Sequence, residues 1–275
     1  MTKLVGRILT WVLIVGWLSF ALGPYVWMFL TSVKPKSEIY SLPFHYFPKH
    51  WTFASYHALF TSTPFIQYVF HSLIVAAFTA LCTLLLAIPA GFSFSRHRFR
   101  GKGIALAMLI SSQFFPSILL ILGIFPLMKE FGLINHLTGL IVIYTAFVTP
   151  FTIWLIKGFF DGIPREIDEA AMIDGCNQFQ VIRHVLLPLL SSGIVAASAY
   201  IVIFSWNEFL FALTFASNSN VMTIPVGLDN FIGNFNINWG ILTAGGVVSA
   251  IPILIFFLVV QRRLISGLTT GAVKS

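Results

Sequence analysis

The sequence predicts an all-α polytopic membrane protein with six transmembrane helices. Of its 275 residues only 9% are charged and 57% are hydrophobic. Soluble proteins carry about 25% charged residues, because charges must cover a water-facing surface. The charges also leave six uncharged runs of at least 24 residues, and about 20 apolar residues suffice for a helix to cross ~30 Å of hydrocarbon. Most of the chain is therefore expected to lie in lipid.

Each uncharged run is expected to hold one helix. We predict these helices at residues 8–31, 69–95, 104–128, 138–160, 187–213 and 240–261. The first could instead be a signal peptide, because Lys3 and Arg7 precede it. The apolar part of a signal peptide is only about 7–15 residues long. This run continues past Trp27, so an uncleaved helix is the stronger expectation.

The second run is the longest, but its polar start is expected to lie outside the membrane near an interface. Proline and glycine inside the predicted spans suggest helix breaks, although both are common in membrane helices generally. The residues concerned are Pro116, Pro126, Pro150, Pro252, Gly123, Gly245 and Gly246.

Basic residues predict the orientation. If the N-terminus is cytoplasmic, twelve of the sixteen Lys and Arg residues fall in inside segments. An excess of Lys and Arg marks cytoplasmic loops, so both termini and the loop 161–186 are expected in the cytoplasm. The basic residues are too scattered for a nucleic-acid-binding face. At most, the cluster at 96–102 is expected to contact anionic lipid head groups.

The loop 161–186 carries five of the nine acidic residues, namely Asp161, Glu166, Asp168, Glu169 and Asp174. Its pattern predicts a helix, a tight turn and a second helix. Pro164 suits the first helical turn, and Gly175 after Asp174 tolerates the left-handed conformation that ends a helix. Asn177 can cap a second helix that runs to Pro188.

Each of these two helices would have one apolar face, which suits docking into a groove of another protein. A solvated linker or a helix pair lying on the bilayer would be plainer explanations. A linker does not need the small residues Ala170, Ala171 and Gly175, and a bilayer-surface helix is usually basic. On the residues alone, docking and these alternatives stay open.

The segment 169–176 reads EAAMIDGC and continues to Leu187 and Pro188. It resembles the EAA signature of binding-protein-dependent ABC importer permeases, which is E-A-A-x-x-D-G-A followed by an apolar stretch and L-P. Further segments agree, including TSVKP at 31–35, HSLIVA at 71–76, WNEF at 206–209, QRR at 261–263 and GLTTGAVK at 267–274. Together they are similar to the six-helix G-type subunit of maltose and oligosaccharide importers. Cys176 and His71 depart from the family's usual alanine and asparagine.

The resemblance implies a type I ABC importer permease fold in the cytoplasmic membrane of a prokaryote. Segment 1–68 would hold the first helix and an extracytoplasmic loop, 69–262 the permease core, and 263–275 a cytoplasmic tail. The implied partners are a homologous second permease, two ATPase subunits, an extracytoplasmic sugar-binding protein and membrane lipid. Nucleic acid is not among them.

In that family the loop corresponding to 161–186 forms a coupling helix that docks into a cleft on the ATPase. Carried over, Glu169 would make the charged contact to the ATPase. Ala170 and Ala171 would form the close-packing surface, and Asp174 and Gly175 the turn that sets the helix angle. The chain itself is not expected to be an enzyme, because its only Gly-Lys pair, at 101–102, lacks the P-loop pattern. ATP and Mg²⁺ are therefore expected on the partner ATPases.

No catalytic set, metal site or cofactor is expected in this chain. The seven histidines are scattered singly, and Cys82 and Cys176 lie far apart without metal-binding spacing.

Two regions are candidates for contact with substrate or binding protein. Asn207 and Glu208 form the first, since a carboxylate at the bilayer centre costs about 2.5–3.5 kcal/mol and should face a cavity or a partner helix. An interfacial carboxylate would explain Glu208 equally well. The second is the loop 214–239, where the resemblance implies contact with the binding protein and a solvated loop is the alternative. Its candidate residues are Asp229, Asn230, Asn234 and Asn236.

The sequence thus favours a permease subunit of an ATP-driven, binding-protein-dependent importer of a sugar or oligosaccharide. A stand-alone secondary transporter or channel is the alternative. Such a protein would be expected to place ionisable residues at mid-membrane for ion coupling, and only Glu208 qualifies. An integral membrane enzyme would need a convergent set of catalytic groups.

Overall fold

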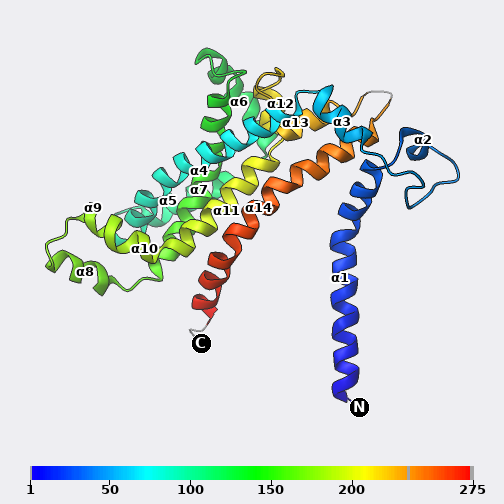
Figure 1. The fold of residues 1–275 in the computed structure, drawn as a ribbon. Coiled ribbons are helices and arrows are strands. Elements are labelled where there is room, and N and C mark those ends of the chain that lie inside the picture. The colour runs from blue at the N-terminus through cyan, green and yellow to red at the C-terminus, as the bar shows by residue number, and fades with distance from the viewer. Residues whose placement is uncertain (1, 234–235, 273–275) are drawn as a thin grey trace. The chain divides into compact units, whose positions relative to one another are not determined.

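The computed structural model describes residues 2–233 and 236–272, with side chains described between 6 and 261. Over these residues the secondary structure is helical, apart from one isolated β-bridge between Ile232 and Ile237 (Figure 1). The chain divides into two compact units. The first comprises residues 1–66 and 227–252, and the second comprises 67–226 and 253–275.

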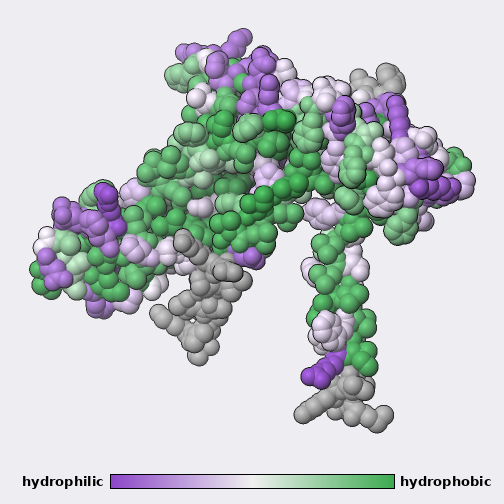
Figure 2. All heavy atoms as spheres, in the orientation of Figure 1, coloured by the Kyte–Doolittle hydropathy of each residue, from purple (hydrophilic) through white to green (hydrophobic). Residues whose placement is uncertain are grey.

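Four helices among the described residues are long and apolar enough to cross a bilayer. They are α1 (Thr2–Ser32), α4 (Phe65–Arg96), α7 (Leu137–Asp161) and α14 (Trp239–Ala272). The visible surfaces of α1 and α14 are mostly hydrophobic along the helix bodies (Figure 2). In α1, for example, Trp17 is 70% exposed and Phe20 is 78% exposed, which suits contact with lipid.

Two helix pairs are together long and apolar enough for a span, but each pair is bent. The helix α5 (Lys102–Ser111) and the 3₁₀ turn η1 (Ser112–Phe114) meet α6 (Ser117–Glu130) at 99°. The segment from α9 (Gln178–Gln180) through the π-helix η2 (Val181–Leu186) to α10 (Leu187–Leu189) meets α11 (Ser191–Asn207) at 80°. If each bent pair counts as one span, the described residues hold six.

The predicted span 104–128 contains the break that the sequence suggested at Pro116, which is confirmed, whereas the prediction of one helix at 187–213 was wrong. The first breaks before Pro116, because the residue before a proline avoids helical geometry and Phe115 is extended with ψ 129°. The second begins only at Ser191 and ends at Asn207, after which the short helix α12 (Leu210–Phe215) follows.

Breaks predicted at three other prolines were also wrong. Pro126, Pro150 and Pro252 lie inside α6, α7 and α14, which continue through them. Gly123, Gly245 and Gly246 likewise lie inside continuous helices. A membrane helix tolerates an internal proline because neighbouring groups and small local adjustments satisfy the freed carbonyl.

In the first unit, a buried lysine holds the chain that leaves α1. Lys34 is only 2% exposed, and its Nζ donates a hydrogen bond to the carbonyl oxygen of His45 at 2.7 Å. The same ammonium lies 4.8 Å from the ring centre of Trp27 and 5.2 Å from that of Phe44. Burial lowers the pKa of Lys34, and the nearby Glu38 carboxylate partly opposes that shift.

The rest of the first unit packs around the C-terminal end of α1 and the start of α14. It contains α2 (Lys36–Ile39) and α3 (Ala54–Thr61). Gly246 of α14 lies against Met28 of α1, where an added Cβ would stand 2.6 Å from the methionine sulfur. Gly245 similarly faces Leu228, near the end of α13 (Ile224–Asp229).

The second unit has two buried apolar clusters. One lies among α4, α6, α7 and α12 and includes Val75, Ile121, Met128, Leu140, Ile143, Tyr144, Phe211, Phe215 and Val226. The other, the loop cluster, joins the ends of α4 and α7 to the segment after α7. The loop cluster consists of Phe92, Ile156, Phe160, Ala171, Val181, Leu186, Leu190 and Ala197.

Glycines bring helices of the second unit into close contact with α7. An added Cβ on Gly91 of α4 would stand 2.8 Å from Ile156, and one on Gly193 of α11 would stand 2.5 Å from the Phe159 ring. Such contacts require that no side chain be present, so these two glycines set the spacing around α7.

We predict that Gly193→Ala lowers the free energy of unfolding by about 1–3 kcal/mol, because the methyl group would overlap the Phe159 ring. The matched control is Gly123→Ala in α6, where an added Cβ meets nothing within 4 Å. That control should be neutral or stabilising, because alanine is the better helix former. Thermal unfolding in detergent micelles measures both, and equal stability of the two variants would contradict the prediction.

Candidate functional site

The acidic loop folds as the predicted helix, turn and second helix. Its first helix is α8 (Arg165–Ile173), and Pro164 is the N-cap residue immediately before it. Asp174 is the C-cap, and Gly175 has φ +90°, the left-handed conformation that favours glycine. Gly175 N–H donates to the carbonyl of Met172, and Cys176 N–H donates to that of Ala171. This pair of bonds is the Schellman arrangement that closes a helix end.

The predicted cap at Asn177 is confirmed. Its side-chain oxygen accepts a hydrogen bond from the backbone N–H of Gln180 at 2.9 Å. The Gln180 side chain accepts in return from the Asn177 N–H at 2.8 Å, which completes a capping box. The turn between α8 and α9 is thus defined on both sides by local hydrogen bonds.

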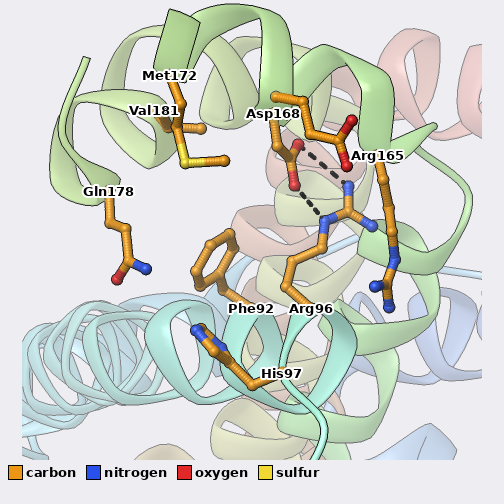
Figure 3. Close-up of a pocket in the computed structure, with 9 residues that line it drawn as sticks. Phe92, Arg96, His97, Arg165, Asp168, Met172, Gln178 and Val181 are labelled. Atoms are coloured by element: carbon orange, nitrogen blue, oxygen red, sulfur yellow. Dashed lines mark hydrogen bonds and ion pairs between the residues drawn. The ribbon is translucent and has the colours of Figure 1, made fainter. Parts of the chain in front are cut away.

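Arg96, the last residue of α4, binds the first helix of this loop through Asp168 (Figure 3). Its Nε donates to Asp168 Oδ2 at 2.5 Å and its Nη2 to Oδ1 at 3.3 Å. The guanidinium also donates to the carbonyls of Phe160 and Ile163, each at 3.0 Å. One side chain therefore connects α4, the end of α7 and α8.

Neighbouring contacts reinforce this junction. Arg165 Nη2 donates to the Ser95 carbonyl at 3.2 Å, and Ser95 Oγ donates to Asp161 Oδ1 at 2.6 Å. Asp161 also pairs with Lys157 one turn earlier. On the same helix, Ala171 packs into the loop cluster. Asp161 and Asp168 are thus held by groups at the ends of α4 and α7.

A small cavity opens between the end of α4 and the loop (Figure 3). Its volume is about 190 Å³, and it is lined by Phe92, Arg96, His97, Arg165, Asp168, Glu169, Met172, Gln178 and Val181. Small-molecule sites usually measure about 300–1,000 Å³, so this cavity suits a single side chain better. Among the described side chains, no three metal-ligating groups converge.

The structure brings the residues expected to contact an ATPase into one element. Glu169 and Ala170 are exposed on α8, whereas Ala171 is buried and faces the chain's own interior. Asp174 and Gly175 form the exposed turn. An added Cβ on Gly175 would meet no atom within 4 Å, so within this chain its backbone conformation, and not a close contact, calls for glycine.

Glu208 lies at the break between α11 and α12. Its carboxylate accepts hydrogen bonds from Tyr144 Oη at 2.6 Å and from the backbone N–H groups of Phe211 at 2.7 Å and Ala212 at 3.0 Å. Glu208 thus caps the start of α12 and links it to α7. Asn207 is exposed, and its amide donates to the carbonyl of Ile203.

The candidates for contact with a binding protein belong to the first unit. Asp229 ends α13, and Asn230 and Asn236 are exposed. The Asn236 carbonyl accepts from the N–H of Gly233 at 3.1 Å. Asn234 lies outside the described residues.

Sequence reasoning missed the roles of Arg96 and Tyr144. Arg96 was assigned to topology and to lipid head groups, but its side chain is only 9% exposed and pairs with Asp168. The two residues are 72 positions apart, and Tyr144 and Glu208 are 64 apart. No local pattern in a single sequence connects residues at such separations.

Comparisons with known proteins all match this chain to transport system membrane components. A family model described as the binding-protein-dependent transport system inner membrane component matches residues 83–269. The sulfoquinovosyl glycerol transport system permease protein SmoH of Agrobacterium fabrum is 33% identical over 253 residues, which cover 92% of this chain and 89% of SmoH. The diacetylchitobiose uptake system permease protein DasC of Streptomyces coelicolor is 35% identical over 251 residues, or 91% of each chain.

A solved structure shares the fold. It is a chain of a bacterial ABC transporter involved in the import of the acidic polysaccharide alginate, with a TM-score of 0.83 and 21% identity. The match covers 95% of this chain and 97% of that one. The predicted all-α membrane permease fold is therefore confirmed.

We predict that Tyr144→Phe lowers the free energy of unfolding by about 1.5–3 kcal/mol, because it removes a hydrogen bond to the Glu208 carboxylate. Tyr200→Phe is the control, since the Tyr200 ring packs at a tilt against Phe151 and its hydroxyl has no partner among the described residues. Thermal unfolding of the purified protein compares them. A Tyr144→Phe variant as stable as the control variant would show that the hydrogen bond contributes nothing.

Proposed function

The chain belongs to the family of binding-protein-dependent transport system inner membrane components, and we propose that it imports a sugar or oligosaccharide as one permease subunit of an ATP-driven complex. The observation that carries this proposal is the α8-turn-α9 element. Glu169 and Ala170 are exposed on the surface of this element, while Arg96 and the loop cluster hold its other side.

Exposed apolar side chains on this element support docking to another protein. Ile173 is 86% exposed, Phe179 is 68% exposed and Met172 is 48% exposed. Hydrophobic and hydrophilic surface lie side by side at the end of the second unit that holds α8 and α9 (Figure 2), and apolar patches rimmed by polar residues mark interaction sites. An ATPase subunit that contacts Glu169, Ala170, Asp174 and Gly175 would cover them.

The substrate class rests on the relatives. SmoH and DasC are named for sulfoquinovosyl glycerol and diacetylchitobiose, and the solved transporter for alginate. All three contain sugar units, so a carbohydrate is the proposed cargo. Asn207 is the exposed candidate for the pathway, whereas Glu208 would act there mainly by keeping the break between α11 and α12 in place.

The proposed arrangement follows from the same family. Each bent pair would form one span, giving six, with both termini and α8 in the cytoplasm of a prokaryote. A homologous permease, two ATPases carrying ATP and Mg²⁺, and an extracytoplasmic binding protein would complete the complex. Asp229, Asn230, Asn234 and Asn236 are the proposed contacts to that binding protein.

Reconstitution tests the function directly. The chain, its sister permease, the ATPases and the binding protein encoded with them would be placed in proteoliposomes, and uptake measured across a panel of oligosaccharides. ATP-dependent uptake of at least one sugar that requires the binding protein is the expected result. ATP-independent uptake driven by an ion gradient would favour a secondary transporter instead.

We predict that Glu169→Lys and Gly175→Val each abolish uptake while the protein still inserts in the membrane. Lysine reverses the charge offered to the ATPase, and valine at φ +90° strains the turn by about 1–3 kcal/mol. Glu166→Lys, an equal charge reversal at an exposed position of the same helix, is the control and should keep most of the uptake. Normal uptake in the Glu169→Lys strain would refute the role of that residue.

A further inference from the structure

We propose that Arg96 is a positioning residue that makes α8 move as one body with the ends of α4 and α7. The inference rests on the proposed function, because it concerns how a force applied to α8 reaches the membrane helices. Nothing in the family signature around Glu169 includes Arg96, which lies 72 residues before its partner Asp168.

The geometry of the guanidinium carries the argument. Arg96 makes four hydrogen bonds, two to Asp168 on α8, one to Phe160 in α7 and one to Ile163 just after it. The group is planar and its donors point in fixed directions, so it holds four acceptor atoms on three residues in one arrangement. A lysine in its place would carry the charge but could not reproduce that fork.

Burial makes the connection stiff. The Arg96 side chain is 9% exposed and that of Asp168 is 10% exposed, so water has little access to replace either partner. Ala171, one turn further along α8, packs into the loop cluster with Phe160 and Phe92. Charged and apolar contacts thus fasten the same face of α8 to the same two helix ends.

The neighbouring arginines differ from Arg96 in their exposure to solvent. Arg98 and Arg100 belong to the same basic stretch but are exposed. Without the Arg96 bonds, α8 would be joined to the ends of α4 and α7 only by residues 162–164, by the single hydrogen bond from Arg165 to the Ser95 carbonyl and by the packing of Ala171. An ATPase closing on α8 would then tilt that helix with less movement of α4 and α7, and ATP would be hydrolysed with less transport.

Distances between spin labels test this claim in the complete complex without knowledge of the sugar. Glu166→Cys on α8 and Arg98→Cys after α4 would carry nitroxides, in a chain with Cys82→Ser and Cys176→Ser. The distance distribution would be measured without nucleotide and with Mg-ATP and vanadate. We expect one narrow distribution that is the same in both states, because α8 and the end of α4 form one body.

Arg96→Gln should broaden the distribution, Arg96→Lys should broaden it less, and the control Arg100→Gln should leave it unchanged. If the glutamine variant fails to assemble, the lysine variant carries the test. A wild-type distance that changes with nucleotide, or a lysine variant as narrow as the wild type, would overturn the proposal.

A functional readout separates positioning from mere folding. With the sugar that the wild-type complex takes up best, Arg96→Lys should lower the sugar imported per ATP hydrolysed at least about fivefold, the lower end of usual coupling between sites. ATP hydrolysis itself should persist. An unchanged ratio of sugar imported to ATP hydrolysed would refute the role of Arg96 but not the proposed function. A wild-type complex that imports no sugar would refute the proposed function.

Discussion

A charge placed in hydrocarbon is so costly that a membrane protein must confine its ionised groups to helix ends or satisfy them completely. This chain has only 9 acidic and 16 basic residues, and the buried ones obey that constraint. Arg96 is paired with Asp168 at the end of α4, Glu208 receives three hydrogen bonds at a helix break, and Lys34 is held by a carbonyl and two aromatic rings. Each of these charges positions a segment.

The two sides of α8 have different surroundings. Its inner side is fastened by Arg96 and by apolar packing of Ala171, whereas Glu169 and Ala170 face outward. The docking role proposed for α8 needs both properties, since an exposed face would bind the partner and a fixed face would transmit the displacement. In the second unit the glycines that bring α4 and α11 against α7 extend that rigid contact along the helices.

Much of this could be predicted from the sequence, because local chemistry determines it. The apolar runs predicted where helices form, Gly175 predicted the turn of the loop, and Asn177 predicted the cap of its second helix. It was harder to predict which prolines break a helix. Pro116 interrupts a helix while Pro150 does not, and the residue before Pro116 is extended. The bonds of Arg96 and Tyr144 depend on which distant helices pack together, and no periodicity encodes that.

The central claim is that the outer face of α8 binds a cytoplasmic ATPase, and photo-crosslinking tests it most directly. A benzophenone amino acid at Ala170, which is exposed on that face, would be activated by light in membranes that contain the assembled complex. The account predicts a covalent product with the ATPase subunit, and no such product from the same group at Leu213 of α12. Crosslinks from Ala170 to lipid alone would contradict it.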